Sequence, residues 1–266
     1  MPRFFDKMRA VLRRDLLTAI RYRSGFALTL AGAIVELAAF FYLSRAIGPG
    51  FRPDGVDYFS FLVVGTGIYT FLVMSVNSFL STVQEAQQTG TLEVLMTTAT
   101  PPATLVFLSA ISALARNLIQ FFVYIVAGLL VFRAPAQVNL PACLLVFVFT
   151  LLIATSFGMF AAAIQIAVQK GAAMVWLLGS GLWFLTGTLF PVSSLPDPLR
   201  ALSHLIPITY LLDAMRLALL EDASFSRLAS DLLILAAFSA LLLPLSLLIF
   251  SRTVRRARTL GTLSFY

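Results

Sequence analysis

The sequence predicts an all-α integral membrane protein. Of its 266 residues, 59% are hydrophobic and the mean hydropathy is +0.93, whereas a soluble domain is usually about 45–50% apolar. A helix needs roughly 20 apolar residues to cross a bilayer. Six runs meet this length: residues 25–47, 58–83, 103–132, 141–168, 172–190 and 232–251. The expected domains are a cytoplasmic interfacial helix (1–24), a six-helix transmembrane domain (25–251) and a basic cytoplasmic tail (252–266).

Residues 3–23 predict a basic amphipathic helix that lies in the membrane plane. Its apolar residues recur every four positions, and its basic residues lie largely off that stripe. The stripe consists of Phe4, Met8, Leu12, Leu16 and Ile20. Each base near an anionic surface contributes about 1 kcal/mol. We therefore assign the net charge of +7 to anionic lipid headgroups and expect no nucleic acid partner.

Two charged residues fall inside predicted spans, Glu36 in the first and Arg116 in the third. A charge at mid-membrane costs about 2.5–3.5 kcal/mol on insertion scales. Splitting the third run at Arg116 would leave 117–132 too short to span, so we predict one long helix from Pro101. Either the two charges form a structural ion pair, or each faces a water-filled path. In such a path, a carboxylate would suit a proton relay.

A long excursion, residues 191–231, precedes the last span. Asp197–Pro198 predicts the start of a short helix. Thr209–Leu220 is apolar almost all round and predicts a helix half immersed in the outer leaflet, with Asp213 and Arg216 as a pair three residues apart. A loop packed on the outer surface fits the same residues.

Basic residues predict the orientation of the spans. Twelve lie in the N-terminal segment, the tail and the short connector 169–171, against six on the opposite side. Both termini are therefore expected in the cytoplasm of a multi-pass plasma (inner) membrane protein. The polar connector 84–102 then also lies on the cytoplasmic side.

The connector 84–102 predicts a docking element. Gly90 interrupts the helix that leaves the membrane, and Thr91 can cap a short new helix. The apolar ridge of that helix consists of Leu92, Leu95 and Met96. The connector holds two acids, Glu85 and Glu93, and no base. An exposed helix with an apolar ridge suits a partner protein, although an ordinary connector whose leucines dip into the headgroups has the same pattern.

The sequence carries no signature of an enzyme, a metal site or a bound cofactor. There is no GxxxxGK[ST] phosphate-binding loop and no HExxH motif. The lone Cys143 and lone His204 give no cysteine–histidine metal spacing. Energy for transport must therefore come from a partner or from a gradient.

Three blocks, in this order and spacing, carry a resemblance that covers nearly the whole chain. The first is Glu85, Gly90–Thr91–Leu92–Glu93, Leu95 and Pro101. The second runs from Gly187–Thr188–Leu189–Phe190–Pro191 through Leu195–Pro196 and Pro207–Ile208–Thr209–Tyr210 to Arg216. The third is Arg255–Arg256–Ala257–Arg258 with Gly261, Leu263 and Tyr266. The chain resembles permeases of the ATP-binding-cassette (ABC) type-2 exporter family.

The resemblance implies roles for particular residues. The connector would be a coupling helix in a cleft of the ATPase subunit, formed by Glu85, Gly90, Thr91, Leu92, Glu93, Leu95 and Met96. The interfacial helix, with Arg13 and Arg14, would also touch the ATPase. The outer helices before the last span would be re-entrant, and Phe190 with Pro191 would form an outer gate. The second and fifth spans would line the path, with Tyr69, Asn77, Trp176, Trp183 and Thr186.

The expected function is that of a permease subunit which exports an apolar or amphipathic drug, lipid or lipid-linked glycan. Its partners would be an ABC ATPase, which binds ATP and Mg, and a second copy of the chain or a related permease. A proton-coupled secondary transporter or a channel without an ATPase is the alternative.

Overall fold

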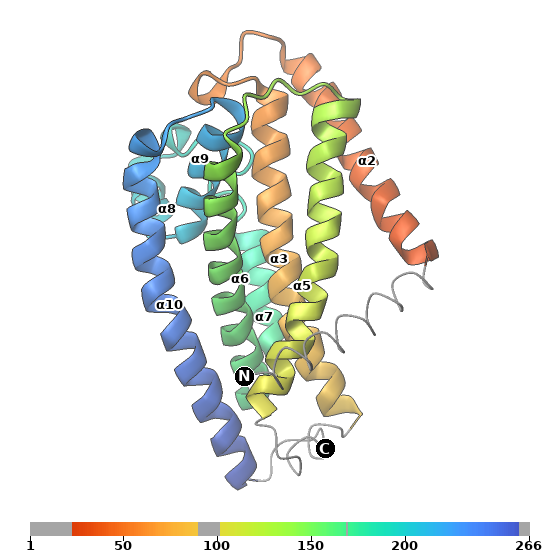
Figure 1. Ribbon diagram of the computed structural model, residues 1–266, viewed down its shortest axis with the longest axis vertical. Coiled ribbons are helices and arrows are strands. Elements are labelled where there is room, and N and C mark those ends of the chain that lie inside the picture. The colour runs from red at the N-terminus through yellow and green to blue at the C-terminus, as the bar shows by residue number, and fades with distance from the viewer. Residues whose placement is uncertain (1–22, 90–101, 169, 261–266) are drawn as a thin grey trace.

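We describe the chain from a computed structural model, which places residues 23–89, 102–168 and 170–260 (Figure 1). Every regular element within these ranges is a helix, as predicted. The long helices are α2 (Arg23–Ile47), α3 (Tyr58–Gln88), α5 (Pro102–Val126), α6 (Leu140–Val168) and α10 (Phe225–Leu260). The shorter ones are α7 (Gly171–Trp176), α8 (Asp197–Ser203) and α9 (Pro207–Leu220). Single turns are η1 (Pro53–Gly55), η2 (Ala127–Val131), η3 (Leu177–Gly181) and η4 (Val192–Ser194).

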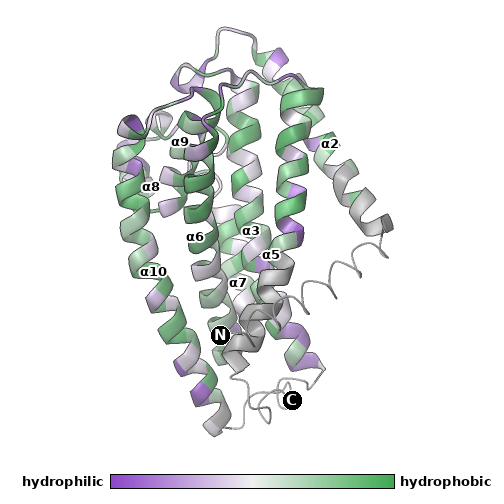
Figure 2. Cartoon of the chain, viewed as in Figure 1, coloured by the Kyte–Doolittle hydropathy of each residue, from purple (hydrophilic) through white to green (hydrophobic). Residues whose placement is uncertain are grey.

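Four helices of the described ranges are long and apolar enough to cross a membrane: α3, Leu114–Val131, α6 and Phe225–Ala257. The pair α8 and α9, bent by 83°, raises the number to five if it is one broken span. Apolar residues cover the length of the bundle and polar residues lie chiefly at its ends (Figure 2). The membrane class is confirmed, and the count of six spans stays a prediction. The predicted interfacial helix lies almost wholly outside the described residues.

The fifth predicted span, 172–190, is not one continuous helix. The chain is helical from Gly171 to Gly181, and residues 182–190 form turns and bends. Gly187 has φ +79, a left-handed conformation that glycine adopts without a steric penalty. The composition of this run predicted a span, but its glycines interrupt the regular backbone before the run ends.

The helix α3 lies at the centre of the bundle. In its most apolar window 83% of the residues are buried, against 17% for α10, so neighbours surround α3 and leave α10 at the periphery. It contacts α2, α5, α6, α7 and α9. Small residues such as Gly65, Gly67 and Ser75 let these neighbours approach closely. Asp57 begins the helix, since its carboxylate accepts a hydrogen bond from the Ser60 backbone N–H at 3.1 Å.

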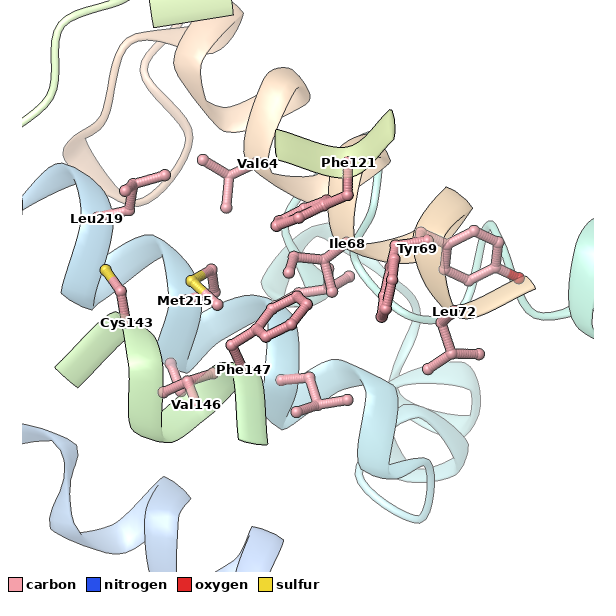
Figure 3. Packing of buried hydrophobic residues seen from close by; sticks show 14 of the residues in the cluster. Val64, Ile68, Tyr69, Leu72, Phe121, Cys143, Val146, Phe147, Met215 and Leu219 are labelled. Atoms are coloured by element: carbon pink, nitrogen blue, oxygen red, sulfur yellow. The ribbon is translucent and has the colours of Figure 1, made fainter. Parts of the chain in front are cut away.

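The main apolar core forms where α3, α5, α6 and α9 meet (Figure 3). Three aromatic rings from three helices lie against one another there: Phe71, Phe121 and Phe147. The ring centroids of Phe71 and Phe121 are 5.5 Å apart, and those of Phe121 and Phe147 are 5.2 Å apart. Tyr69 lies at the edge of this cluster and points its hydroxyl away from it (Figure 3).

The short helix α9 differs from its prediction in its first residue and in its burial. The helix begins at Pro207 rather than Thr209 and ends at Leu220 as predicted. The Asp213–Arg216 ion pair is confirmed, with Arg216 Nη1 at 3.7 Å from Asp213 Oδ1. However, α9 is largely buried by α3, α6 and α10 rather than half immersed in lipid. An apolar helix can satisfy its hydrophobic surface inside a protein as well as in lipid, and sequence does not separate the two.

Two sets of helix ends lie at opposite ends of the bundle (Figure 1). One end holds the turn after α2, the α5–α6 loop and the turn between α9 and α10. Backbone hydrogen bonds fasten the last two together: Asn139 N–H donates to Ala218 O at 2.9 Å, and Asp222 N–H donates to Gln137 O at 2.8 Å. The other end holds the ends of α3, α6 and α10 and the starts of α5 and α7. We call these the outer and the inner end.

Candidate functional site

A buried arginine organises the outer end. Arg216 of α9 is only 5% exposed. Its Nη2 donates hydrogen bonds to the carbonyl oxygens of Gly187 at 2.8 Å, Thr188 at 3.2 Å and Phe61 at 3.4 Å. Its Cζ lies 3.4 Å from the ring centroid of Phe61, a cation–π contact. One guanidinium therefore joins α9, the irregular chain after η3, and α3.

Gly65 leaves space for this guanidinium. A Cβ on Gly65 would collide with Arg216 Nη2 and with the carbonyl oxygen of Thr188. Gly187, which has a positive φ, supplies one of the carbonyl oxygens that accept from Arg216. A larger residue at position 65 would therefore close the place that the arginine occupies.

A cavity of about 370 Å³ adjoins Arg216 at the outer end. Its charged lining has both signs: Asp54, Asp213 and Glu221 face Arg200, Arg216 and the imidazole of His204. The predicted outer-gate residues Phe190 and Pro191 are half-buried at its border, just before the lining residues Val192 and Ser193. The cavity therefore presents both signs of charge to a ligand.

Glu36 lies between two further cavities midway along the bundle. One, of about 270 Å³, is lined by α2, α3 and α5, and the other, of about 280 Å³, is lined by α2, α3 and the η3 region. The predicted path residues Tyr69 and Trp183 line the second cavity together with Glu36. The Tyr69 hydroxyl donates a hydrogen bond to the Leu178 carbonyl and so fastens α3 to η3.

Of the two alternatives for Glu36 and Arg116, the ion pair does not form among the described residues. Arg116 is exposed on α5 and does not line either cavity, whereas its neighbour Asn117 does. The side chains of these two neighbours leave the helix about 100° apart, and of the two it is Asn117 that lines the cavity. Asn117 instead donates a hydrogen bond from Nδ2 to Ser78 Oγ at 3.0 Å.

A buried amide cluster fastens three helices at the inner end. Gln165 in the last turn of α6 donates a hydrogen bond from Nε2 to Gln87 Oε1 of α3 at 3.1 Å. The Gln165 Oε1 accepts the backbone N–H of Gly171, the first residue of α7, at 3.1 Å. Both glutamines are at most 2% exposed. Gln87 is two residues from Thr89, where the described part of α3 meets the connector.

The remaining predicted site residues are placed as follows. Glu85 is exposed on the last turns of α3, and Asn77 and Trp176 are exposed on α3 and α7. Thr186 is buried and shares a hydrogen bond with Thr188, so it belongs to the outer turn and not to the cavities. The predicted coupling and interfacial residues outside the described ranges are Gly90, Thr91, Leu92, Glu93, Leu95, Met96, Arg13 and Arg14.

Sequence reasoning missed the glutamine pair and the polar residues around Glu36. Gln165 is an amide inside an apolar run, and such residues in predicted spans usually face protein or water, so this signal was present. Thr70 and Gln120 line the first cavity, but their positions reveal nothing until α2, α3 and α5 are placed together.

The family model described as ABC-2 type transporter matches residues 6–220. This range includes the connector, both Glu36 cavities and all but the last long helix. No curated protein matches the chain.

We expect Arg216→Lys to lower the free energy of unfolding by about 2 kcal/mol, because lysine cannot reach all the carbonyls that a guanidinium reaches, and buried acceptors without a partner cost about 1–3 kcal/mol. The matched control is Arg227→Lys, since Arg227 forms a partly exposed pair with Glu221. It should stay within about 0.5 kcal/mol of the wild type. Unfolding of both proteins in detergent gives the comparison, and equal stability would contradict the role assigned to Arg216.

Proposed function

Because the chain belongs to the ABC-2 type transporter family, we propose that it is the permease subunit of an exporter that a separate ATPase drives. The family and the helical membrane fold make it a transport subunit.

The observation that carries the proposal is the position of the amide cluster. The most buried helix, α3, ends at Gln88 and leads into the connector whose acidic, apolar-ridged sequence suits a docking helix. Gln165 joins the same turn of α3 to α6 and α7. A force on the connector would therefore move three helix ends together, which is what coupling to an ATPase requires.

The absence of a phosphate-binding loop from the sequence supports placing ATP and Mg on the partner. ATP binding would close two ATPase subunits beneath two permeases related by a two-fold axis. The second permease would be a copy of this chain or a related one. Exposed apolar residues on α2 and α7, such as Val35, Tyr42 and Trp176, support contact of these helices with a second permease or with lipid.

The cargo that suits this apolar chain is an amphipathic molecule, such as a drug, a lipid or a lipid-linked glycan. One observation favours the alternative of proton coupling: no hydrogen bond or ion pair reaches Glu36 within the described residues. A proton-driven transporter would need the gradient, ignore ATP and lose transport in Glu36→Gln. Transport in liposomes with ATP and no gradient separates the two mechanisms.

We predict that an ATPase subunit copurifies with the chain and that Glu93→Arg breaks the complex, because a charge reversal in the acidic connector places like charges against the docking cleft. Asp222→Asn changes a charge at the outer end and should leave the complex intact. Affinity purification followed by ATPase assay measures both. A Glu93→Arg protein that keeps its ATPase and transports normally would place the docking surface elsewhere.

We predict that Gln165→Leu reduces transport per ATP hydrolysed more than it reduces ATPase activity. The leucine removes both the acceptor of Gly171 N–H and the donor to Gln87, so α3 loses its polar connection to α6 and α7. Gln137→Leu, at an exposed position of the α5–α6 loop, is the control and should match the wild type. Equal losses of transport and hydrolysis in Gln165→Leu would speak against a coupling role.

We predict that the inner end faces the cytoplasm, as the distribution of basic residues requires. The native cysteine, Cys143, is removed by Cys143→Ser. Single cysteines are then introduced at Gln88, which is exposed, and at Leu205, which is 71% exposed. An impermeant thiol reagent should label position 205 in intact cells and position 88 only after permeabilisation. The reverse pattern would invert the orientation.

A further inference from the structure

We propose that the two cavities around Glu36 form a binding site for a lipophilic organic cation. The proposal deepens the proposed function, on which it rests for the identification of the ligand as cargo. The binding itself needs no ATPase and can be measured without one.

The site has an acidic centre without a protein counter-charge. Glu36 lines both cavities, and Thr70 and Met74 are common to them as well. Within the described residues, neither a cation nor a hydrogen-bond donor contacts the Glu36 carboxylate. A carboxylate at this depth is costly in hydrocarbon, and a cationic ligand would offset that cost by supplying the missing partner.

The lining suits an organic cation better than a metal ion. Phe71, Phe121 and Tyr124 line the first cavity, and Tyr69 and Trp183 line the second. Aromatic faces attract ammonium and phosphonium groups. No group of three or more metal-ligating side chains occurs in the described part of the chain, so a bare metal ion would lack ligands there.

Two polar side chains beside Glu36 form hydrogen bonds with other residues and not with its carboxylate. The Tyr124 hydroxyl is held by Thr66 Oγ1 at 2.9 Å, and Asn117 is held by Ser78. The side chains of Thr70 and Gln120 have no hydrogen-bond partner among the described residues and can bind polar atoms of a ligand. Most pockets for small ligands combine an apolar wall with a few such convergent polar groups.

Small residues on α2 provide room for the ligand. Gly32 and Ala33 lie one turn before Glu36, on the same face of the helix. A side chain at Gly32 would meet nothing within 4 Å, so open space remains there. Each cavity is slightly below the about 300–1,000 Å³ of typical ligand pockets, and a ligand that extends across Glu36 would use both.

The test compares two ions of nearly equal shape and opposite charge, tetraphenylphosphonium and tetraphenylborate. Equilibrium binding to the purified full-length chain in detergent should show saturable binding of the phosphonium. The borate should bind at least about tenfold more weakly, as expected for a close charge contact. This comparison uses the wild-type protein and does not depend on a variant that folds. Equal affinities for the two ions would overturn the proposal.

A variant pair assigns the charge selectivity to Glu36. Glu36→Gln keeps the side-chain size and should weaken phosphonium binding at least about tenfold. Asp222→Asn removes an acid at the outer end, where a positive φ is tolerated by asparagine, and should bind as the wild type does. Unchanged phosphonium affinity in Glu36→Gln would also overturn the proposal.

Transport separates this proposal from the function on which it rests. Charge-selective phosphonium binding, with no ATP-driven transport of phosphonium or of any other cargo, would keep the site and reject the exporter. ATP-driven export of another cargo, without charge-selective phosphonium binding, would keep the exporter and reject the site.

Discussion

A bilayer offers no hydrogen bonds, and this constraint orders the polar residues of the protein. Arg216 meets it with three carbonyls and a phenyl face, and Gln165 meets it with Gln87 and the first N–H of α7. Thr66 and Tyr124 meet it together. No hydrogen bond or ion pair reaches Glu36 among the described residues, where the buried Arg216 Nε and Gln87 Nε2 also have no hydrogen-bond partner.

The central helix α3 connects these polar groups along the length of the bundle. Phe61 and Gly65 contact Arg216 near its outer end, Thr70 lines the cavities at its middle, and Gln87 joins the amide cluster near its inner end. Since α3 is buried along most of its length, it cannot shift without repacking its neighbours. This helix is thus suited to carry a change at the inner end to the cavities and to the outer turn.

Sequence reasoning succeeded where local chemistry decides the result. The hydrophobic runs located the long helices. Arg116 did not divide the third run, since a break there would have left 117–132 too short to span the membrane. Asp197–Pro198 located α8, and the spacing of Asp213 and Arg216 predicted their pair. It failed for the fifth run, where hydropathy does not report that Gly187 adopts a left-handed backbone.

The sequence by itself determined the membrane class, the approximate helices, the family resemblance and the presence of a charge at Glu36, since these depend on composition and on short-range order. Only the tertiary structure decided which groups meet. Arg116 is exposed and lines neither Glu36 cavity, whereas the next residue, Asn117, lines one of them. The segment α9 is buried in protein because α3, α6 and α10 surround it. Contacts between helices depend on their relative rotation and packing, which periodicity in one segment does not specify.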